Sequence, residues 1–399
     1  MEMAPIEIVG IIIATLFLFE VIRSHLDQSH ALRFNKDSIN DNVLQEFPSV
    51  SVIRPIKGLD FGAEENAKAA LNHGYPGEIE VIFVFDDENE PGVPAVKAAL
   101  EEFPDVNARI IYCGQPKTGW TGKLNAMLVA SQEAVGDIIA FADSDIRSDE
   151  NTLRSLVESL LSNDNSGAAF APVVAQIRPE TIGDAGYNIL LNGLYSPALA
   201  KVAKKSGNKL SFVMGQYMIF RRQSLDAIGG IESAEGQLVD DMFLGARISN
   251  AGYDNMVSAR PVSIIQSNLS FSQFWSIFKR WIAFSRSGLS NHDLKLISWI
   301  RGILFWVSFV GAILSPSMIV AMIFAISNLL LNASIIRLDS IVRGRSMKLW
   351  HWPMVPFLFL SAPIIYLSIF LGREVNWRGR NYSLDGDAKL SQKNRQGME

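Results

Sequence analysis

Hydrophobic residues form long runs near the two ends of the chain and short runs between them. The first run, 6–22, is interrupted only by Glu7 and Glu20, and Glu2 precedes it. A cleaved signal peptide would carry basic residues before the run and a small-residue cleavage site after it. Here the basic residues follow the run: Arg23, His25, His30, Arg33 and Lys36. This order predicts an uncleaved anchor over residues 1–24, with the N-terminus outside.

Between residues 49 and 267, short β-rich runs alternate with helix-length segments. The runs are 50–53, 79–85, 109–112, 138–141 and 168–174. Strands separated by helices indicate βαβ units and a mostly parallel sheet, in which ligands bind at the carboxyl ends of the strands. We therefore predict an α/β, Rossmann-like domain over residues 45–290.

The last third of the chain is strongly apolar. Residues 302–336 carry no charge and are bracketed by Arg301 and Arg337. A continuous helix of that length would measure roughly 50 Å, too long for one crossing of a ~30 Å apolar core. The Ser-Pro-Ser sequence at 315–317 can turn the chain, so two short antiparallel spans are expected.

A further apolar run, 353–371, contains Pro356 and Pro363, which predicts a kinked or re-entrant segment. Together these two or three segments form a predicted C-terminal membrane region at 297–372, followed by a polar tail at 373–399. Charge does not decide the number of crossings. If every run spans, the arginines of the tail lie outside, against the positive-inside tendency.

Composition supports the membrane segments and narrows the partners. Hydrophobic residues make up 48% of the chain, high for a purely soluble protein. The net charge of −5 gives no reason to expect nucleic acid, and nothing indicates a protein partner. Cys113 is the single cysteine, which rules out an intrachain disulfide or a cysteine-based metal site and favours a cytosolic catalytic part.

Asp143-Ser144-Asp145 follows the apolar run 138–141, and only Ala142 lies between them. Two carboxylates at this spacing can both reach a hard cation, which prefers oxygen ligands and often shares them with phosphates. An isolated D-x-D is more often an acidic turn or a helix cap. Its position at a strand end, where doubly wound sheets bind ligands, favours a metal site.

Three other strand ends carry polar candidates. Asp86 closes run 79–85 and can accept hydrogen bonds from a nucleotide base or ribose, or serve as a solvated cap. Pro55 fixes the chain direction after the first run, and Lys57 places a cation nearby. Lys123 lies in a glycine-containing segment before a helix, which suits an anion or is a plain turn, and which lacks P-loop spacing.

Asp240 and Asp241 open the amphipathic stretch 242–248. They can be a capping pair in the first helical turn, or one of them can be a general base that takes a proton from an acceptor hydroxyl. Spacing alone does not decide between these interpretations.

An aromatic face with basic residues opposite predicts a helix over 270–287 that lies in the membrane interface, with core packing as the alternative. Its apolar positions recur at helical spacing: Phe271, Phe274, Trp275, Phe278 and Ile282.

In this order, the motifs resemble those of family 2-type nucleotide-sugar glycosyltransferases with the GT-A fold, and among them the ceramide glucosyltransferase-like family 21. The resemblance covers nearly the whole chain. The segments that carry it are 51–58, Asp86, 142–147, 228–230, Asp240-Asp241 and Arg280-Trp281.

The resemblance implies a donor site for a UDP-sugar. Asp86 would bind the uridine, with Pro55 and Lys57 shaping the same pocket, and Lys123 would assist at the nucleotide. Asp143 would contribute to the donor site and also, with its D-x-D partner, to the metal site.

The resemblance also implies catalytic roles. Asp143 and Asp145 would hold Mg²⁺ or Mn²⁺ against the diphosphate, and Asp241 matches the catalytic base. Arg280 and Trp281 match the end of the Q-x-x-R-W signature, which lies near donor and acceptor.

The sequence departs from the family pattern at two positions. Ile277 occupies the glutamine position of Q-x-x-R-W, which leaves the contribution of this motif to acceptor contacts open and argues against a processive synthase. Asp240 stands where glutamate is common, a mild change.

The expected reaction is inverting transfer of a hexose, glucose first, from a UDP-sugar to the hydroxyl of a membrane lipid such as ceramide. The alternatives are transfer to diacylglycerol or a hopanoid, a processive polysaccharide synthase, and an inactive membrane scaffold or lipid-binding protein. The expected location is a bacterial inner membrane, with the catalytic domain facing the cytosol.

Overall fold

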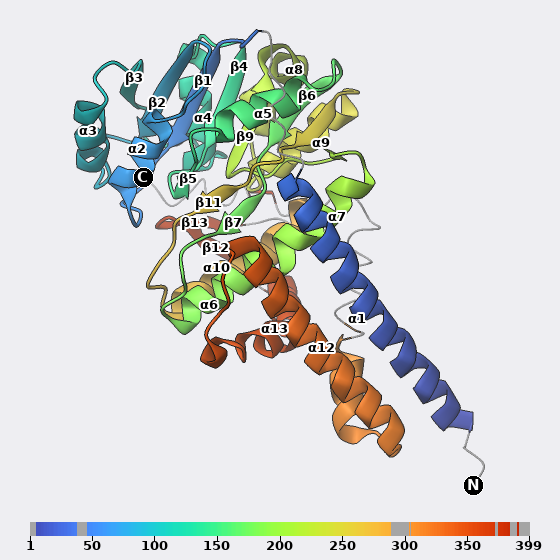
Figure 1. Ribbon diagram of the computed structural model, residues 1–399. Coiled ribbons are helices and arrows are strands. Elements are labelled where there is room, and N and C mark those ends of the chain that lie inside the picture. The colour runs from blue at the N-terminus through green and yellow to red at the C-terminus, as the bar shows by residue number, and fades with distance from the viewer. Residues whose placement is uncertain are drawn as a thin grey trace. The chain divides into compact units, whose positions relative to one another are not determined.

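The computed structural model describes residues 5–37, 46–288, 303, 305–371, 374–383 and 389–390. The chain divides into two compact units (Figure 1). The unit that we call the helical unit comprises Met1–Phe34, Arg178–Lys201 and Ser267–Leu371, and the sheet unit comprises Asn35–Ile177, Val202–Gln266 and Gly372–Glu399.

The sheet unit is built on an eight-stranded sheet in the order β3-β2-β1-β4-β9-β6-β10-β8. Six strands run in one direction, and β8 and β9 run against them. The strands are β1 Val50–Pro55, β2 Ile79–Phe85, β3 Ala108–Tyr112, β4 Ile138–Ala142, β6 Ser166–Phe170, β8 Lys209–Leu210, β9 Tyr217–Arg221 and β10 Asp254–Val257. The predicted α/β fold with a mostly parallel sheet is confirmed.

The core of this sheet lies along β2 and β4. Every side chain from Val81 to Phe85 is fully buried, and so is nearly all of β4. Such continuous burial is typical of parallel strands that are covered on both faces, and it explains why their sequences are apolar runs rather than alternating ones.

The sheet unit contains two smaller sheets. One is three-stranded, in the order β5-β11-β7, and the other is the hairpin β12–β13. Their strands are β5 Ile146–Arg147, β7 Val173–Ala175, β11 Val262–Ile264, β12 Glu374–Trp377 and β13 Arg380–Ser383.

Helices connect the strands of the sheet unit. They are α2 Ala63–Leu71, α3 Val93–Glu102, α4 Gly122–Glu133, α5 Thr152–Leu161, α8 Arg222–Ala227, the short η2 Ile231–Ala234 and α9 Asp240–Asn250. Thr121 caps α4, because its hydroxyl accepts a hydrogen bond from the backbone N–H of Leu124 at 3.1 Å.

Two details of the sheet differ from what the hydrophobic pattern predicted. The predicted strand 168–174 is divided between β6 and β7, which belong to different sheets. Pro172 separates them, since proline has no N–H to continue a ladder. The antiparallel strand β9 was not predicted; it inserts between β4 and β6 and brings residues 215 and 216 to the carboxyl edge of the parallel strands.

The helical unit contains the long apolar helices. Its elements are α1 Pro5–Asp37, α6 Ile182–Asn188, the π-helical η1 Ile189–Tyr195, α10 Phe271–Gly288, an apolar helix Phe305–Leu314, α12 Met318–Arg343, η3 Leu349–His351 and α13 Met354–Leu371. The chain passes from this unit to the sheet unit within α7 Ser196–Lys205.

Two described segments, Pro5–Arg33 and Met318–Arg343, are long and apolar enough to cross a membrane. Large apolar side chains on both are exposed, for example Leu16 at 63% and Leu329 at 71%. Exposed apolar surface of this extent fits a membrane-associated protein. The predicted start of the C-terminal region at residue 297 lies outside the described residues.

The predicted turn at 315–317 separates the helix Phe305–Leu314 from α12, and the backbone N–H of Ser317 donates to the hydroxyl of Ser315 at 3.3 Å. Pro363 lies inside α13. On α10, Phe274 and Phe278 stack on one another with ring centroids 5.9 Å apart and are almost fully buried, whereas Phe271 is 43% exposed. Much of the aromatic face therefore packs within the unit, and its contact with lipid stays a prediction.

Candidate active site

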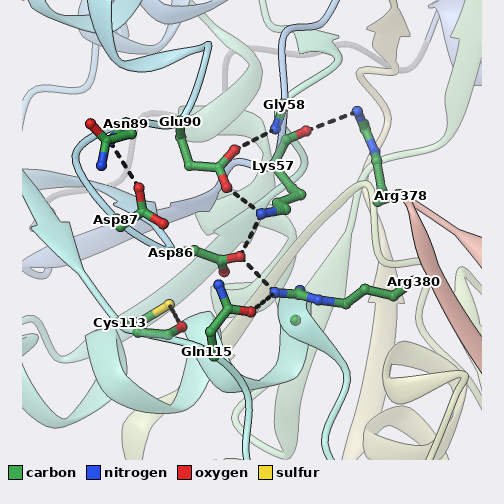
Figure 2. A network of polar contacts seen from close by, with 12 residues as sticks. Lys57, Gly58, Asp86, Asp87, Asn89, Glu90, Cys113, Gln115, Arg378 and Arg380 are labelled. Atoms are coloured by element: carbon green, nitrogen blue, oxygen red, sulfur yellow. Dashed lines mark hydrogen bonds and ion pairs between the residues drawn. The ribbon is translucent and has the colours of Figure 1, made fainter. Parts of the chain in front are cut away.

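The carboxyl ends of β1 and β2 bring the first two candidate residues together. The strands pair in parallel, with Pro55 beside Val84, so the residues that follow each strand leave the sheet at the same edge. Lys57 donates through Nζ to Oδ2 of Asp86 at 2.7 Å (Figure 2). Asp86 is only 6% exposed, so this is a sheltered charge pair rather than a solvated cap.

Glu90 joins this pair from the same connection between β2 and α3 that begins with Asp86. It accepts a short hydrogen bond from the Lys57 ammonium and another from the backbone N–H of Gly58 at 3.0 Å (Figure 2). Burial lowers the pKa of Lys57, but the two carboxylates outweigh it and raise the pKa, so the ammonium stays charged. Glu90 was not predicted as a site residue from the sequence.

A second lysine neutralises the first D-x-D carboxylate. Lys123, in the first turn of α4, lies 2.6 Å from Oδ1 of Asp143 and donates to the carbonyl oxygen of Gly215 at 3.2 Å. Burial lowers the pKa of Lys123, while Asp143, Asp240 and Asp241 together raise it above its usual value. Lys123 therefore stays positively charged beside these three acids.

A buried arginine binds the backbone of the D-x-D turn. Arg54 of β1 is 2% exposed and donates to the carbonyl oxygens of Asp143 at 3.0 Å and Ile146 at 3.3 Å. The backbone N–H of Asp143 also donates to the carbonyl of Gln216 at 2.9 Å. Arg54 of β1 and Gln216, which directly precedes β9, therefore fix the backbone of the turn that carries these carboxylates.

Asp145 lies in a crowded set of acids. Burial raises its pKa to about 6, helped by the negative charges of Asp143 and Asp60. Gln266 donates to its carboxylate at 3.5 Å. A divalent cation would remove the repulsion that raises this pKa, and oxygen ligands of this kind suit Mg²⁺ or Mn²⁺. Over the described ranges, no group of three or more His, Cys, Asp or Glu side chains is arranged to hold a metal by itself.

Asp241 is the second residue of α9 and lies at the same edge of the sheet. Its Oδ2 accepts from the backbone N–H of Gly215 at 2.6 Å, and its Oδ1 accepts from that of Met242 at 2.8 Å. A Cβ at position 215 would come within 2.8 Å of Oδ2, so glycine is required for this approach. Burial, and then the charge of Asp240, raise the pKa of Asp241 to about 6. A carboxylate with this pKa is a good general base near neutral pH.

Arg280 and Trp281 lie on α10, in the helical unit. The Trp281 ring packs between two tyrosines, with centroids 5.7 Å from Tyr187 and 5.4 Å from Tyr195. Their predicted role near donor and acceptor stays a prediction.

Two arginines of the hairpin β12–β13 were not predicted as site residues, because their segment reads as part of a polar tail. Arg380 donates to Oδ2 of Asp86 at 2.6 Å, and Arg378 lies 2.5 Å from Oδ1 of Asp60 (Figure 2 shows both arginines). A sequence signal was available, because residues 374–383 are two short segments joined by two residues that end in glycine, although Arg-Gly lacks the Asn or Gly that is usual at the first position of such a turn. The rest of the predicted tail, 384–388 and 391–399, lies outside the described residues.

Comparison with known proteins finds a family match over nearly the whole chain. The model of the family described as Glycosyl transferase family 21 matches residues 3–390. Ceramide glucosyltransferase 3 of Caenorhabditis elegans is 25% identical over 390 residues, which cover 94% of this chain and 80% of the relative. The ceramide glucosyltransferase of Candida albicans is 30% identical over 129 residues, 30% of this chain and 24% of the relative.

Among solved structures, a mannosyltransferase from Pyrobaculum calidifontis in complex with GDP-Man and Mn²⁺ aligns with a TM-score of 0.48 and 17% identity. The alignment covers 90% of this chain and 99% of that one. Glucosyl-3-phosphoglycerate synthase of Mycobacterium tuberculosis aligns with a TM-score of 0.38 and 17% identity, over 66% and 86% of the two chains.

Proposed function

Since the chain belongs to glycosyl transferase family 21 and is therefore a glycosyltransferase, we propose that it transfers one hexose, preferably glucose, from a UDP-sugar to the hydroxyl of a membrane lipid such as ceramide. The observation that carries this proposal is the joint position of Asp86, Asp143, Asp145 and Asp241, with Lys57 and Lys123, at one edge of the sheet unit.

The donor binds along that edge in this proposal. Asp86 accepts hydrogen bonds from the uridine, and Pro55 and Lys57 shape the same subsite. Asp143 and Asp145 hold a divalent cation, which supplies Lewis-acid stabilisation of the leaving diphosphate when it is bound. Lys123 remains beside Asp143, and its fixed positive charge stabilises the negative charge that develops on the leaving UDP.

Asp241 acts as the general base. It takes the proton of the lipid hydroxyl as the hydroxyl oxygen attacks the anomeric carbon. The new carbon–oxygen bond forms on the face opposite the breaking bond to UDP, so the anomeric configuration inverts. The backbone N–H groups of Gly215 and Met242 keep the carboxylate aimed while its charge changes.

A lipid acceptor is supported by the helical unit and by the named relatives. α1 and α12 are long enough to span a membrane, and the curated relatives described above are ceramide glucosyltransferases. Arg280 and Trp281 are proposed to contact donor and acceptor. We place the protein in a bacterial inner membrane with the sheet unit facing the cytosol, where nucleotide sugars are made.

The test is a product analysis. Membranes that contain the full chain are incubated with labelled UDP-glucose, UDP-galactose, UDP-glucuronic acid or UDP-N-acetylglucosamine, each with ceramide, diacylglycerol or a hopanoid. We expect one hexose per ceramide, with anomeric configuration opposite to that of the donor, by mass spectrometry and NMR. Long sugar chains would indicate a polysaccharide synthase, and no UDP release with any pair would indicate a scaffold.

The pH profile gives a second prediction. The pKa of Asp241 is raised to about 6, so its basic form is lost as the pH falls through that value. At saturating donor and metal, we expect kcat to be flat above about pH 7 and to fall about tenfold per pH unit below about pH 5, since one proton blocks the base.

The metal concentration separates Asp241 from Asp145, whose pKa is raised to about the same value. A metal ion competes with the proton on its ligands, so excess Mn²⁺ should restore turnover at low pH only if Asp145 is the titrating group. A decline in kcat that persists at saturating Mn²⁺ supports Asp241; a profile that is flat down to pH 4.5 contradicts its role as base.

A further inference from the structure

The hairpin β12–β13 reaches the acids of the candidate site with both of its arginines. Its two-residue connection is Arg378-Gly379, with φ of 51° and 77°. Positive φ at both positions is typical of the type I′ turn, which matches the twist of a two-stranded hairpin. Asn or Gly is the usual residue at the first of these positions, so an arginine there is held against its conformational preference.

Arg380 extends the contacts at the nucleotide end of the site. Its Nη2 donates to Asp86 at 2.6 Å and to Oε1 of Gln115 at 2.8 Å (Figure 2). Gly122 leaves room for this guanidinium, because a Cβ at that position would lie 1.9 Å from Nη1 of Arg380. Asp86 is thus shared by two cations, Lys57 from the loop after β1 and Arg380 from the hairpin.

Arg378 reaches the other end of the site, at the D-x-D turn. Nη1 contacts Asp60 at 2.5 Å and the carbonyl oxygen of Lys57 at 3.3 Å, and Nη2 lies 3.9 Å from Oδ2 of Asp145. Its side chain is 37% exposed, so water or a ligand can still reach it.

The chain after the hairpin is also attached to the sheet unit. Leu390 donates through its backbone N–H to the carbonyl oxygen of Gly236 at 2.9 Å, and Lys389 bridges to Gln237. Gln237 lies three residues before Asp240 in the sequence. The C-terminal segment therefore contacts the rest of the sheet unit at two places. Its hairpin binds Asp60 and Asp86, and Lys389 and Leu390 bind the loop that precedes α9.

We propose that this hairpin is part of the donor-binding site, with Arg380 a positioning residue for the nucleoside through Asp86 and Arg378 a ligand of the diphosphate. A guanidinium presents five N–H donors in a planar fork, so Arg378 can retain one carboxylate and still bind phosphate oxygens. Besides Lys57 and Lys123, the site gathers Asp60, Asp86, Asp143 and Asp145, and an anionic donor gains from additional positive charge beside these four acids. This inference rests on the proposed function, because it assumes that the donor is a nucleotide sugar.

The two arginines should have different binding signatures. The full chain in detergent is titrated with UDP, GDP and ADP in the presence of Mn²⁺, and the diphosphate that binds most tightly is compared with its monophosphate. Arg378→Ala should weaken the diphosphate about 10- to 100-fold and the monophosphate much less, the size expected from losing charged hydrogen bonds. Arg380→Ala should weaken both nucleotides alike, because it acts at the nucleoside end.

Conservative and remote variants control for folding. Arg378→Lys and Arg380→Lys should recover part of the affinity, since they keep the charge but lose the fork. Arg154→Ala removes an arginine of comparable exposure that pairs with Glu158 on α5, and it should bind as the wild type does. Thermal unfolding of each variant shows whether the sheet unit is intact.

Nucleotide affinity that is unchanged or tighter in both alanine variants overturns the proposal; tighter binding would identify the hairpin as a lid that competes with the donor. Transfer by the wild type is measured in the same preparation. If the wild type binds a nucleotide diphosphate through these arginines but glycosylates no lipid, the hairpin assignment stands and the proposed lipid reaction fails.

Discussion

Replacement of Asp241 by Asn is expected to lower kcat about 10²- to 10⁴-fold, the contribution usual for a general base, and to leave the affinity for the nucleotide nearly unchanged. The amide cannot take the proton of the acceptor hydroxyl, whereas Asp86, Asp143 and Lys123 still bind the donor. Turnover with UDP-glucose and ceramide, together with UDP titration of the same sample, measures both quantities.

The same substitution has a predictable cost in stability. Both carboxylate oxygens of Asp241 accept backbone N–H groups, from Gly215 and Met242. Asn offers only one acceptor, so one N–H loses its partner, which costs about 1 kcal/mol. Above about pH 6 this cost is opposed, because Asn also removes the penalty for ionising Asp241 in its buried position. Asp226→Asn, an exposed acid on α8, is the matched control and should behave as the wild type does. Near-normal kcat in Asp241→Asn would show that another group is the base.

Replacement of Asp145 by Asn should lower turnover roughly 10²- to 10³-fold, as is usual when one electrostatic element of an active site is removed. It should also raise the Mn²⁺ concentration needed for half-maximal activity, because one of the two proposed metal ligands loses its charge. A Mn²⁺ titration of the initial rate measures both effects.

Stability should move in the opposite direction. Burial and the charges of Asp143 and Asp60 raise the pKa of Asp145, so the folded state disfavours its ionised form. The neutral Asn removes that penalty, which should raise the free energy of unfolding of the metal-free protein on the order of 1 kcal/mol above about pH 6. Below about pH 3, Asp145 is protonated in the folded and unfolded states alike, and the gain disappears.

Opposite signs for activity and stability distinguish this prediction from simple misfolding. Asp164→Asn is a suitable control, because Asp164 is an exposed acid that precedes β6, at the amino end of that strand. Loss of turnover together with lower stability in Asp145→Asn would indicate a structural acid instead, and unchanged metal dependence would remove Asp145 from the proposed metal site.

Hydrophobic pattern predicted the elements of the sheet that are locally determined. The runs that became β2 and β4 are continuous and apolar because parallel strands are buried on both faces. The residues just after them, Asp86 and Asp143 among others, could be assigned to one edge, since parallel strands all end on the same side of the sheet. Membrane-length helices near both ends of the chain followed from the length and composition of their runs alone.

Antiparallel and C-terminal parts of the site were not predictable in this way. β9 carries no alternation, and only its pairing with β4 and β6 places Gly215 beside Asp241. The pKa of Asp241 depends on this burial, so no local reading of Asp240-Asp241 could choose between a capping pair and a base.

By itself, the sequence determined the α/β class, the apolar end segments and the set of acids, because each of these features depends on residues that are neighbours along the chain. Only the tertiary structure decided which charge partners those acids have. Asp86 meets Arg380 across 294 positions of sequence, and Asp60 meets Arg378 across 318. Contacts at such separation depend on how distant segments pack, and periodicity along the chain carries no information about that.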